Sequence, residues 1–211
     1  MLLCRPSIII QVAYLMKLIL ASTSPYRRTI LEKLCIPFSC AAPNIDETPL
    51  KSETADELVQ RLAAEKAQSI AKSHKGLIIG SDQVAFAKGT ILGKPGNKTK
   101  AIEQLKMLST ETVTFYTGLS LLDSDTGRQQ TMVETFDVTF KQLSVAQINR
   151  YLDLETPYDC AGSFKSEGLG IALFSSLHGR DPNSLIGLPL IALIELLTSF
   201  DIDAFDYMQP A

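Results

Sequence analysis

The chain has 211 residues, of which 45% are hydrophobic and 20% are charged. This length and composition are typical of one globular domain, or of one domain with two lobes, and they exclude a disordered chain, a coiled coil and a collagen-like rod. The net charge is −3. Because proteins that grip many nucleic-acid phosphates are usually basic, we expect no nucleic-acid partner, whereas a small phosphorylated ligand needs only a few local cations.

Cysteine and histidine usage narrows the chemistry further. None of the four cysteines shows C-x-x-C spacing, and the chain has only two histidines. These counts argue against a zinc knuckle, a thioredoxin-type motif and a histidine-based metal or nucleophile site. We interpret the cysteines as reduced, mostly buried apolar groups in a cytoplasmic protein.

The N-terminus combines a basic residue, an apolar run and small residues, as a secretory signal does. Gln11 and Lys17 interrupt this run, which is shorter than the roughly 20 apolar residues that cross a membrane. Cleavage after it would also remove the strand that leads into the first candidate site. We therefore expect residues 1–15 to be a dispensable extension, 16–200 the folded domain and 201–211 an unstructured tail, with no membrane association.

The predicted elements begin with a buried strand at residues 18–21. Ser24 then caps a helix whose first position is Pro25. Residues 38–42 form the next strand, and the polar residues 43–53 form a loop.

A second helix is predicted over residues 54–73, where apolar residues recur with a helical period and Thr54 and Glu57 can form a capping box. Residues 77–80 form another buried strand. Since βα units are followed by a long antiparallel hairpin, we predict an α/β protein with a mixed sheet. The later elements are a hairpin at 86–92, a helix at 98–108, β-rich runs at 112–122 and 130–141, a helix at 144–154, a glycine-rich loop at 161–170 and an apolar helix at 188–200.

Hydroxyl and basic side chains are concentrated between residues 22 and 28, where a strand leads into a helix. A helix start exposes unpaired N–H groups and a partial positive charge, so with nearby guanidinium groups it can bind phosphate. The alternative is an ordinary capped helix with exposed arginines. The candidate binding residues here are Ser22, Ser24, Tyr26, Arg27 and Arg28.

Two carboxylates are candidates for metal and proton chemistry. Glu47 follows Asp46 in the first loop, where the alternative is a solvated acidic pair. Asp82 follows the strand at 77–80, and ligands of open α/β sheets bind beyond the carboxyl ends of strands. Asp82 is therefore a candidate metal ligand or general base, and the alternative is the cap of a turn.

Three lysines and one more carboxylate complete the set. Lys66 lies on the second helix and Lys94 precedes a proline, although each is also compatible with ordinary surface charge. Lys165 and Glu167 lie in the glycine-rich loop, which can approach a ligand closely or simply pack on the core, and which lacks the P-loop pattern. A few cations, a few carboxylates and no usable histidine favour a metal-assisted phosphate reaction.

Seven segments together resemble the Maf family of nucleoside triphosphate pyrophosphatases, and most closely its branch that acts on 7-methyl-GTP. The resemblance covers about residues 16–200. The segments are 22–28, 46–48, 65–67, 80–83, 93–95, 161–168 and 187–190.

The resemblance implies an elongated mixed sheet with flanking helices and two lobes around a cleft, as in inosine triphosphate pyrophosphatases of the Maf/Ham1 type. It implies hydrolysis of a nucleoside triphosphate to the monophosphate and diphosphate with Mg²⁺ or Mn²⁺, which would keep modified nucleotides out of nucleic acids. A homodimer is a further expectation, because members of the family often form dimers.

The resemblance also assigns roles. Ser22 and Arg27 would hold the triphosphate, and Lys66 and Lys94 would neutralise its charge. The carboxylates Glu47 and Asp82 would serve the metal and the attacking water, with Asp82 as proton acceptor. Ser24, Arg28 and Lys165 are further substrate-binding candidates.

Three positions depart from the commonest family pattern. Tyr26 stands where that pattern has an arginine, and Gln83 and Glu167 stand where the pyrimidine-preferring branch has Thr and Gln. The methylated guanine is a cation, so Tyr26 could stack on it and Glu167 could accept its N–H groups. The alternatives are a dTTP or UTP pyrophosphatase of the same family, a nucleotide-sensing regulator of septum formation, and a nucleotidyltransferase, for which the sequence shows no acceptor site.

Overall fold

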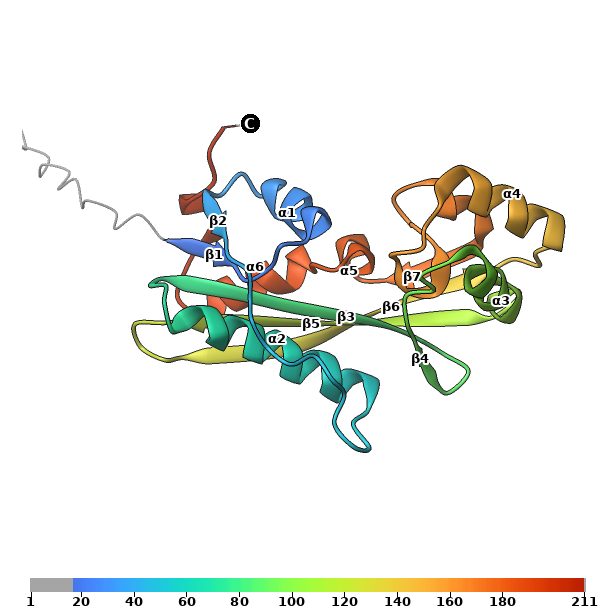
Figure 1. Ribbon diagram of the computed structural model, residues 1–211. Coiled ribbons are helices and arrows are strands. Elements are labelled where there is room, and N and C mark those ends of the chain that lie inside the picture. Colours follow the sequence, from blue (N-terminus) through green and yellow to red (C-terminus); the bar gives the residue numbers. More distant parts are fainter. Residues whose placement is uncertain (1–16, 211) are drawn as a thin grey trace, which may run out of the picture.

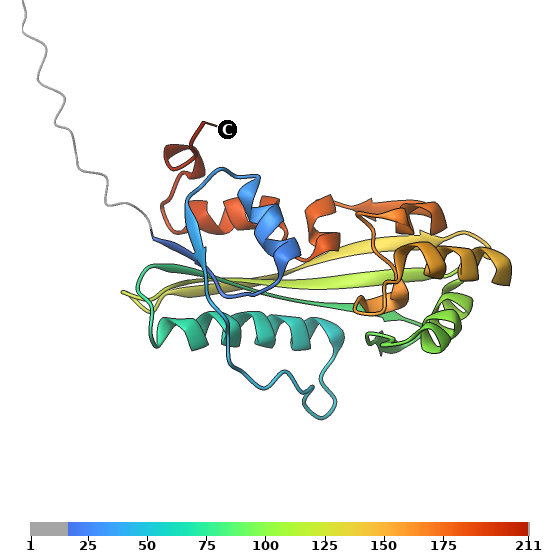
Figure 2. The same cartoon turned by 45° about the horizontal axis from the view of Figure 1, so that its top comes forward.

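A computed structural model describes residues 17–210. These residues form a seven-stranded mixed sheet with the order β2-β1-β3-β5-β6-β7, and β4 pairs with β3. The sheet runs along the whole molecule, with α2 on one face and α1, α5 and α6 on the other, while α3 and α4 lie at the far end (Figures 1 and 2). The elements are β1 (Leu18–Leu20), α1 (Pro25–Glu32), β2 (Phe38–Cys40), α2 (Ala55–Ala71), β3 (Leu77–Ala87), β4 (Thr90–Leu92), α3 (Lys98–Leu108), β5 (Thr112–Asp123), β6 (Gln129–Phe140), α4 (Val145–Glu155), β7 (Phe174–Gly179), α5 (Pro182–Ile186) and α6 (Leu190–Ser199).

The N-terminal lobe is built on β1, which runs parallel to β2 and β3. Every residue of β1 is buried because helices cover both faces of the sheet here. Leu18 and Leu20 face the α1 and α6 side, whereas Ile19 packs with Ala67 of α2 on the other side. The predicted Ser24 cap of α1 and the predicted capping box of α2 are both confirmed.

The C-terminal lobe is built on the far ends of β3, β5 and β6, with α3 and α4 packed against them. Its centre is an aromatic cluster in which Phe164 makes edge-to-face contacts with Phe115, Phe140 and Phe174 at centroid distances of 5.5, 5.3 and 5.0 Å. Such contacts add to area burial. The cluster fixes the glycine-rich segment around Phe164 to the lobe.

Strand β3 is longer than predicted. It continues from Leu77 to Ala87, because β5 pairs with it from Leu77 to Phe86. Asp82 therefore lies within the strand, and its predicted position beyond the strand's end is wrong. Strand β1 ends opposite Ile79, however, so Asp82 lies just past the carboxyl end of the neighbouring strand.

Side-chain alternation along β3 separates two sets of residues. Gly80 faces α2 so closely that a Cβ there would collide with the backbone carbonyl of Ala63. Asp82, two residues on, shares this face. Ser81 and Gln83 point to the opposite face and contact the segment around α5.

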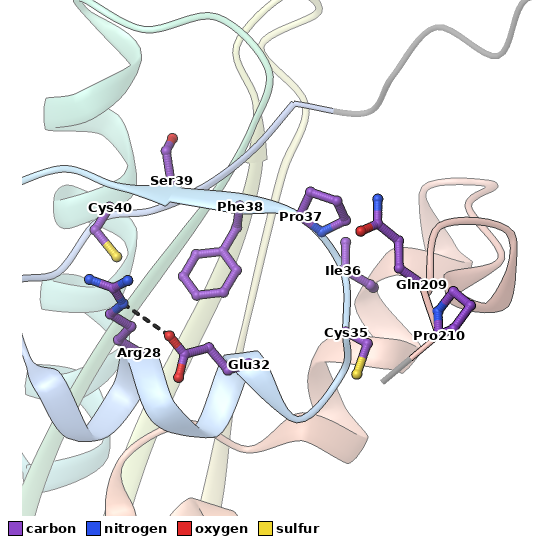
Figure 3. A pocket seen from close by; sticks show the side chains of 10 residues that line it. All are labelled: Arg28, Glu32, Cys35, Ile36, Pro37, Phe38, Ser39, Cys40, Gln209 and Pro210. Carbon is purple, nitrogen blue, oxygen red and sulfur yellow. Dashed lines mark hydrogen bonds and ion pairs between the residues drawn. The ribbon is translucent and has the colours of Figure 1, made fainter.

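Two elements were not predicted, namely β7 and α5, and the apolar helix α6 begins at Leu190 rather than at residue 188. The predicted unstructured tail is also wrong for residues 201–210. Ala204 is buried against the α1 and α6 side, and the Gln209 N–H donates to the Cys35 carbonyl at 2.8 Å. Gln209 and Cys35 line the same surface pocket (Figure 3).

The predicted extension, residues 1–15, lies outside the described residues and stays a prediction. Across residues 17–210, the longest apolar helical stretches all fall short of what a membrane crossing requires.

Candidate active site

A cleft of about 630 Å³ lies where the two lobes meet. One wall is formed by residues 21–27 after β1, and the opposite wall by residues 159–167. The structure brings all the predicted site residues except Arg28 to this cleft. They are Ser22, Ser24, Tyr26, Arg27, Glu47, Lys66, Asp82, Gln83, Lys94, Lys165 and Glu167.

Arg28 lies outside the cleft. Its Nε is 3.0 Å from Glu32 Oε1 on the exposed side of α1, where both side chains line a separate surface pocket (Figure 3). Successive residues of a helix point about 100° apart, so Arg28 points away from the side of α1 on which Arg27 lines the cleft. The expectation that Arg28 binds the same substrate is therefore not supported by its position.

A buried lysine holds the two candidate carboxylates together. Lys66 Nζ is 2.6 Å from Asp82 Oδ1 and 2.8 Å from Glu47 Oε1. Lys66 and Asp82 are buried, whereas the Glu47 side chain is 59% exposed. Helix α2, strand β3 and the loop after β2 thus each contribute one charge to a single cluster.

This cluster suits a metal that arrives with a phosphorylated ligand. Mg²⁺ is usually bound by one or two carboxylates together with substrate phosphates and water. Glu47 and Asp82 supply two such carboxylates at the edge of the cleft. Among residues 17–210 no three His, Cys, Asp or Glu side chains are grouped for a metal, so a site made of protein ligands alone is not indicated in this part of the chain.

Arg27 is fixed in its position by the backbone. Its Nε donates to the Gly187 carbonyl at 2.8 Å, and the Ser81 hydroxyl donates to the same oxygen at 2.8 Å. Burial lowers the pKa of Arg27, while the nearby Asp82 and Glu47 act in the opposite direction. A guanidinium stays protonated in proteins, so Arg27 presents a fixed positive charge at the cleft. No motif in the sequence predicts the contact between Ser81, Gly187 and Arg27.

The start of α1 adds polar groups beside this charge. Ser22 is buried, and its Oγ accepts from the Ser24 N–H at 3.1 Å. Ser24 Oγ caps the helix by accepting from the Arg27 N–H at 3.4 Å. Lys94 reaches the same cleft from the loop after β4.

Beside Tyr26 of the first wall, the opposite wall of the cleft adds basic and acidic groups. Tyr26 is 38% exposed and lies near Lys165 and Glu167. Burial raises the pKa of Tyr26, and Lys165 opposes this effect. Asp159 and Cys160 also line this wall, and neither was predicted, because no motif in the sequence marks them.

Gln83 lines the cleft and also bonds to the protein on the other side of the sheet. Its Nε2 donates to the Ser184 carbonyl at 2.6 Å and to Thr117 Oγ1 at 2.9 Å. The side-chain amide nitrogen thus ties β3 to α5. Gln83 lines the cleft, but its N–H groups are already engaged with the protein.

Known proteins resemble this chain over most of its length. Residues 17–200 match the family model described as Maf-like protein. The chain belongs to the Maf family. It is 73% identical over 194 residues to the 7-methyl-GTP pyrophosphatase of Pseudoalteromonas atlantica, which covers 92% of this chain and 100% of that protein. It is 56% identical over 181 residues to the protein of the same name from Vibrio vulnificus, covering 86% of this chain and 93% of that one.

The fold expectation is also confirmed. The Ham1 protein of Staphylococcus aureus aligns over 88% of this chain and 99% of its own, with a TM-score of 0.50 and 14% sequence identity. At this identity the likeness concerns the fold alone. The resemblance to the Maf family and its 7-methyl-GTP branch is confirmed by the family match and the two relatives.

Proposed function

We propose that this chain hydrolyses 7-methyl-GTP to the nucleoside monophosphate and diphosphate. The observation that carries the proposal is one cleft with two chemically different ends. The Lys66, Asp82 and Glu47 cluster lies at one end, and Tyr26 faces Glu167 at the other. The names of the 73% and 56% identical relatives support the same substrate.

At the phosphate end, this chain supplies fixed charges of both signs. Arg27, Lys66 and Lys94 bind the triphosphate and stabilise the charge that develops on the leaving diphosphate. A divalent cation, Mg²⁺ or Mn²⁺, held by Glu47 and Asp82, would supply charge neutralisation and a more acidic water when bound.

Asp82 is the proton acceptor in this proposal. Water attacks the α-phosphorus, the α–β anhydride bond breaks, and the water proton passes to the Asp82 carboxylate. Asp82 is held for this task by Lys66 Nζ at 2.6 Å and by its place within a long strand. The sheet therefore fixes the base while the ligand occupies the open side of the cleft.

At the base end, the charge of the methylated guanine is the feature to recognise. The ring of Tyr26 can stack on a delocalised cation. The carboxylate of Glu167 can accept from the guanine N1–H and amino groups. A neutral pyrimidine would gain less from that carboxylate, because uracil and thymine offer one N3–H donor and no positive charge.

The test uses purified protein with Mg²⁺ and a panel of 7-methyl-GTP, GTP, dTTP, UTP and CTP. Released phosphate is counted with and without added inorganic pyrophosphatase. We expect a signal that requires the added enzyme and is largest for 7-methyl-GTP. A preference for dTTP or UTP would keep the reaction and reject the base assignment. Binding without turnover would favour the nucleotide-sensing alternative.

Glu167→Gln tests the base end separately. We expect the preference for 7-methyl-GTP over GTP to fall about tenfold, because a charge-assisted hydrogen bond is worth roughly 1.5–3 kcal/mol. Glu103→Gln, on the exposed side of α3, is the matched control. An unchanged preference in the Glu167 variant would remove Glu167 from base recognition. The cytoplasmic location and the homodimer stay predictions.

A further inference from the structure

We infer that Tyr151 and Glu155 of α4, neither of which lines the cleft, position the loop that carries Lys165 and Glu167. They act as positioning residues for base selection. This inference rests on the proposed function of the base end. Nothing in the sequence motifs pointed to either residue.

Two backbone hydrogen bonds attach the loop to α4. The Lys165 N–H donates to Tyr151 Oη at 3.1 Å, and the Leu169 N–H donates to Glu155 Oε2 at 2.7 Å. Tyr151 and Glu155 are four residues apart on one helix, so they present neighbouring side chains on one face. Both are well shielded from solvent. The two anchors bracket Glu167, which lies midway between them.

The loop is shaped to fit the Glu155 carboxylate. A Cβ at Gly168 would lie 2.7 Å from Glu155 Oε2 and 3.0 Å from Oε1, so the carboxylate fills the space where a side chain would be. The loop also closes on itself, since the N–H groups of Gly168 and Gly170 donate to the Lys165 carbonyl at 3.3 and 3.0 Å. A side chain at residue 168 would have to displace the Glu155 carboxylate.

The charge of Glu155 also acts on the lysine of the loop. Glu155 Oε1 is 4.0 Å from Lys165 Nζ, and Lys165 in turn faces Tyr26 and Asp159. The Glu155 carboxylate thus accepts from the backbone N–H of Leu169 at one end of the loop and pairs with the Lys165 ammonium at the other. Its removal frees both Lys165 and Glu167, while the triphosphate end on the other wall is untouched.

The experiment compares Glu155→Ala with Glu155→Gln, whose amide oxygen can still accept from Leu169. Asp153→Ala is the matched control, because Asp153 is an exposed acid on the same helix that pairs with Lys98. For Glu155→Ala we expect the ratio of kcat/KM between 7-methyl-GTP and GTP to fall about tenfold, mainly through KM, as loss of a charge-assisted hydrogen bond predicts. The Asp153 control should stay within about twofold of the wild type, and Glu155→Gln, which keeps the hydrogen bond but loses the charge, should fall between the control and Glu155→Ala.

Two further readouts separate positioning from general damage. The inhibition constant of inorganic tripolyphosphate should be the same in all variants, because it reports on the phosphate end. Amide hydrogen exchange at Leu169 should be faster in Glu155→Ala and unchanged in Glu155→Gln. If Glu155→Ala does not fold, Tyr151→Phe takes its place, with faster exchange expected at Lys165.

The outcomes are distinct. An unchanged substrate ratio in Glu155→Ala would overturn the inference even if exchange is faster, and unchanged exchange would overturn the anchoring itself. Weaker tripolyphosphate binding would also overturn it, because the defect would then not be confined to the base end. A wild type that does not discriminate between 7-methyl-GTP and GTP would reject the proposed function, while exchange at Leu169 would still decide the anchoring.

Discussion

Asp82 is the only carboxylate that is both buried and in direct contact with the buried ammonium of Lys66 among the described residues of the cleft. Its backbone is paired with Gly118 in the centre of the sheet, so the carboxylate has little freedom to move. A general base needs a fixed position within reach of the proton that it takes. The residue therefore offers the most direct test of the mechanism.

Asp82→Asn keeps the size of the side chain and removes its basicity. We expect kcat to fall by a factor of about 10²–10⁴, which is the usual contribution of a general base. Steady-state hydrolysis of 7-methyl-GTP measures the change, and the thermal melting curve verifies the fold. Asp125→Asn, on the exposed turn after β5, should leave kcat unchanged. Turnover within a few-fold of the wild type would contradict the role of Asp82.

The reactivity of the Cys160 thiol reports on the electrostatic environment of the base end. Burial, together with the adjacent Asp159 carboxylate, raises the pKa of the Cys160 thiol to about 12. At pH 8 roughly one such thiol in ten thousand is ionised, and only the thiolate is a good nucleophile. We expect iodoacetamide to alkylate the exposed Cys40 well before Cys160, as measured by peptide mass spectrometry. Equal rates at the two cysteines would contradict this environment.

The loop between β2 and α2 carries Glu47 although it contains neither helix nor strand. Arg61 of α2 holds it in place. Arg61 Nε and Nη2 are 2.6 and 2.8 Å from the two carboxylate oxygens of Glu53, and Nη2 also donates to the Thr48 carbonyl at 3.2 Å. The Glu53 side chain is only 7% exposed. A bidentate pair of this kind fixes geometry as well as charge.

This arrangement predicts a dependence of stability on acid. Hydrogen bonds from Arg61 hold the pKa of Glu53 below its usual range, and those from Thr48 do the same for Asp46. A carboxyl group with a lowered pKa in the folded state stabilises the protein above its unfolded pKa, and this stabilisation is lost as pH falls through the folded value. The loss is therefore expected below about pH 4.

Urea unfolding between pH 3 and 6 measures this dependence. We expect the free energy of unfolding to fall toward pH 3, and Glu53→Gln to be less stable at pH 6 with a smaller change on acidification. Glu103→Gln serves as an exposed control. Superimposable pH profiles for the wild type and Glu53→Gln would show that the pair does not contribute.

Local patterns explain which elements the sequence could predict. The helices α2 and α3 have regular apolar periods and clear starts, and α1 has a serine cap followed by proline, so these three are recognised from neighbouring residues alone. Strand β7, with the sequence Phe-Ser-Ser-Leu-His-Gly, shows no clear alternation and is stabilised by pairing with β6. The length of β3 likewise depends on a partner strand that comes later in the chain.

The candidate site also contains residues that the sequence predicts and contacts that it does not. The candidate binding residues lie in short motifs, so the sequence and the family resemblance predicted nearly all of them. The supporting contacts could not be predicted, because they join residues far apart in the chain. Arg27 depends on Gly187, which is 160 positions away, and Gln83 is engaged by α5, an element that was not predicted. Arg28 was misplaced because its motif gives the residue types but not which side of the helix faces the ligand.

At the scale of the whole molecule, each lobe contributes residues to a different end of the cleft. In the proposed function, Arg27 and Lys66, from the N-terminal lobe, would form the phosphate end, whereas Lys165 and Glu167, from the loop fixed to α4, would form most of the base end. Strands β3, β5 and β6 run through both lobes and join them in one continuous sheet. The distance between the two ends of the cleft is thus set by the sheet rather than by a flexible linker.

The C-terminal segment contributes to stability rather than to the cleft. Ala204 is buried, Ile202, Tyr207 and Met208 pack against the same core as α1 and α6, and the Gln209 N–H bonds to Cys35. Ending the chain after residue 200 exposes this core. We expect the free energy of unfolding to fall by about 2–4 kcal/mol, given roughly 25 cal/mol per Å² of apolar surface.

Urea unfolding of the shortened chain measures this loss, and 7-methyl-GTP hydrolysis at low temperature measures its effect on the site. We expect kcat/KM to stay close to that of the full chain, because no residue from 201 to 210 lines the cleft. Phe205→Ser is the matched control within the segment, since Phe205 is 79% exposed and its replacement removes little buried surface. Coincident unfolding curves for the shortened and full chains would show that the segment adds nothing to the core, and a loss of kcat/KM without a loss of stability would place it in the active site instead.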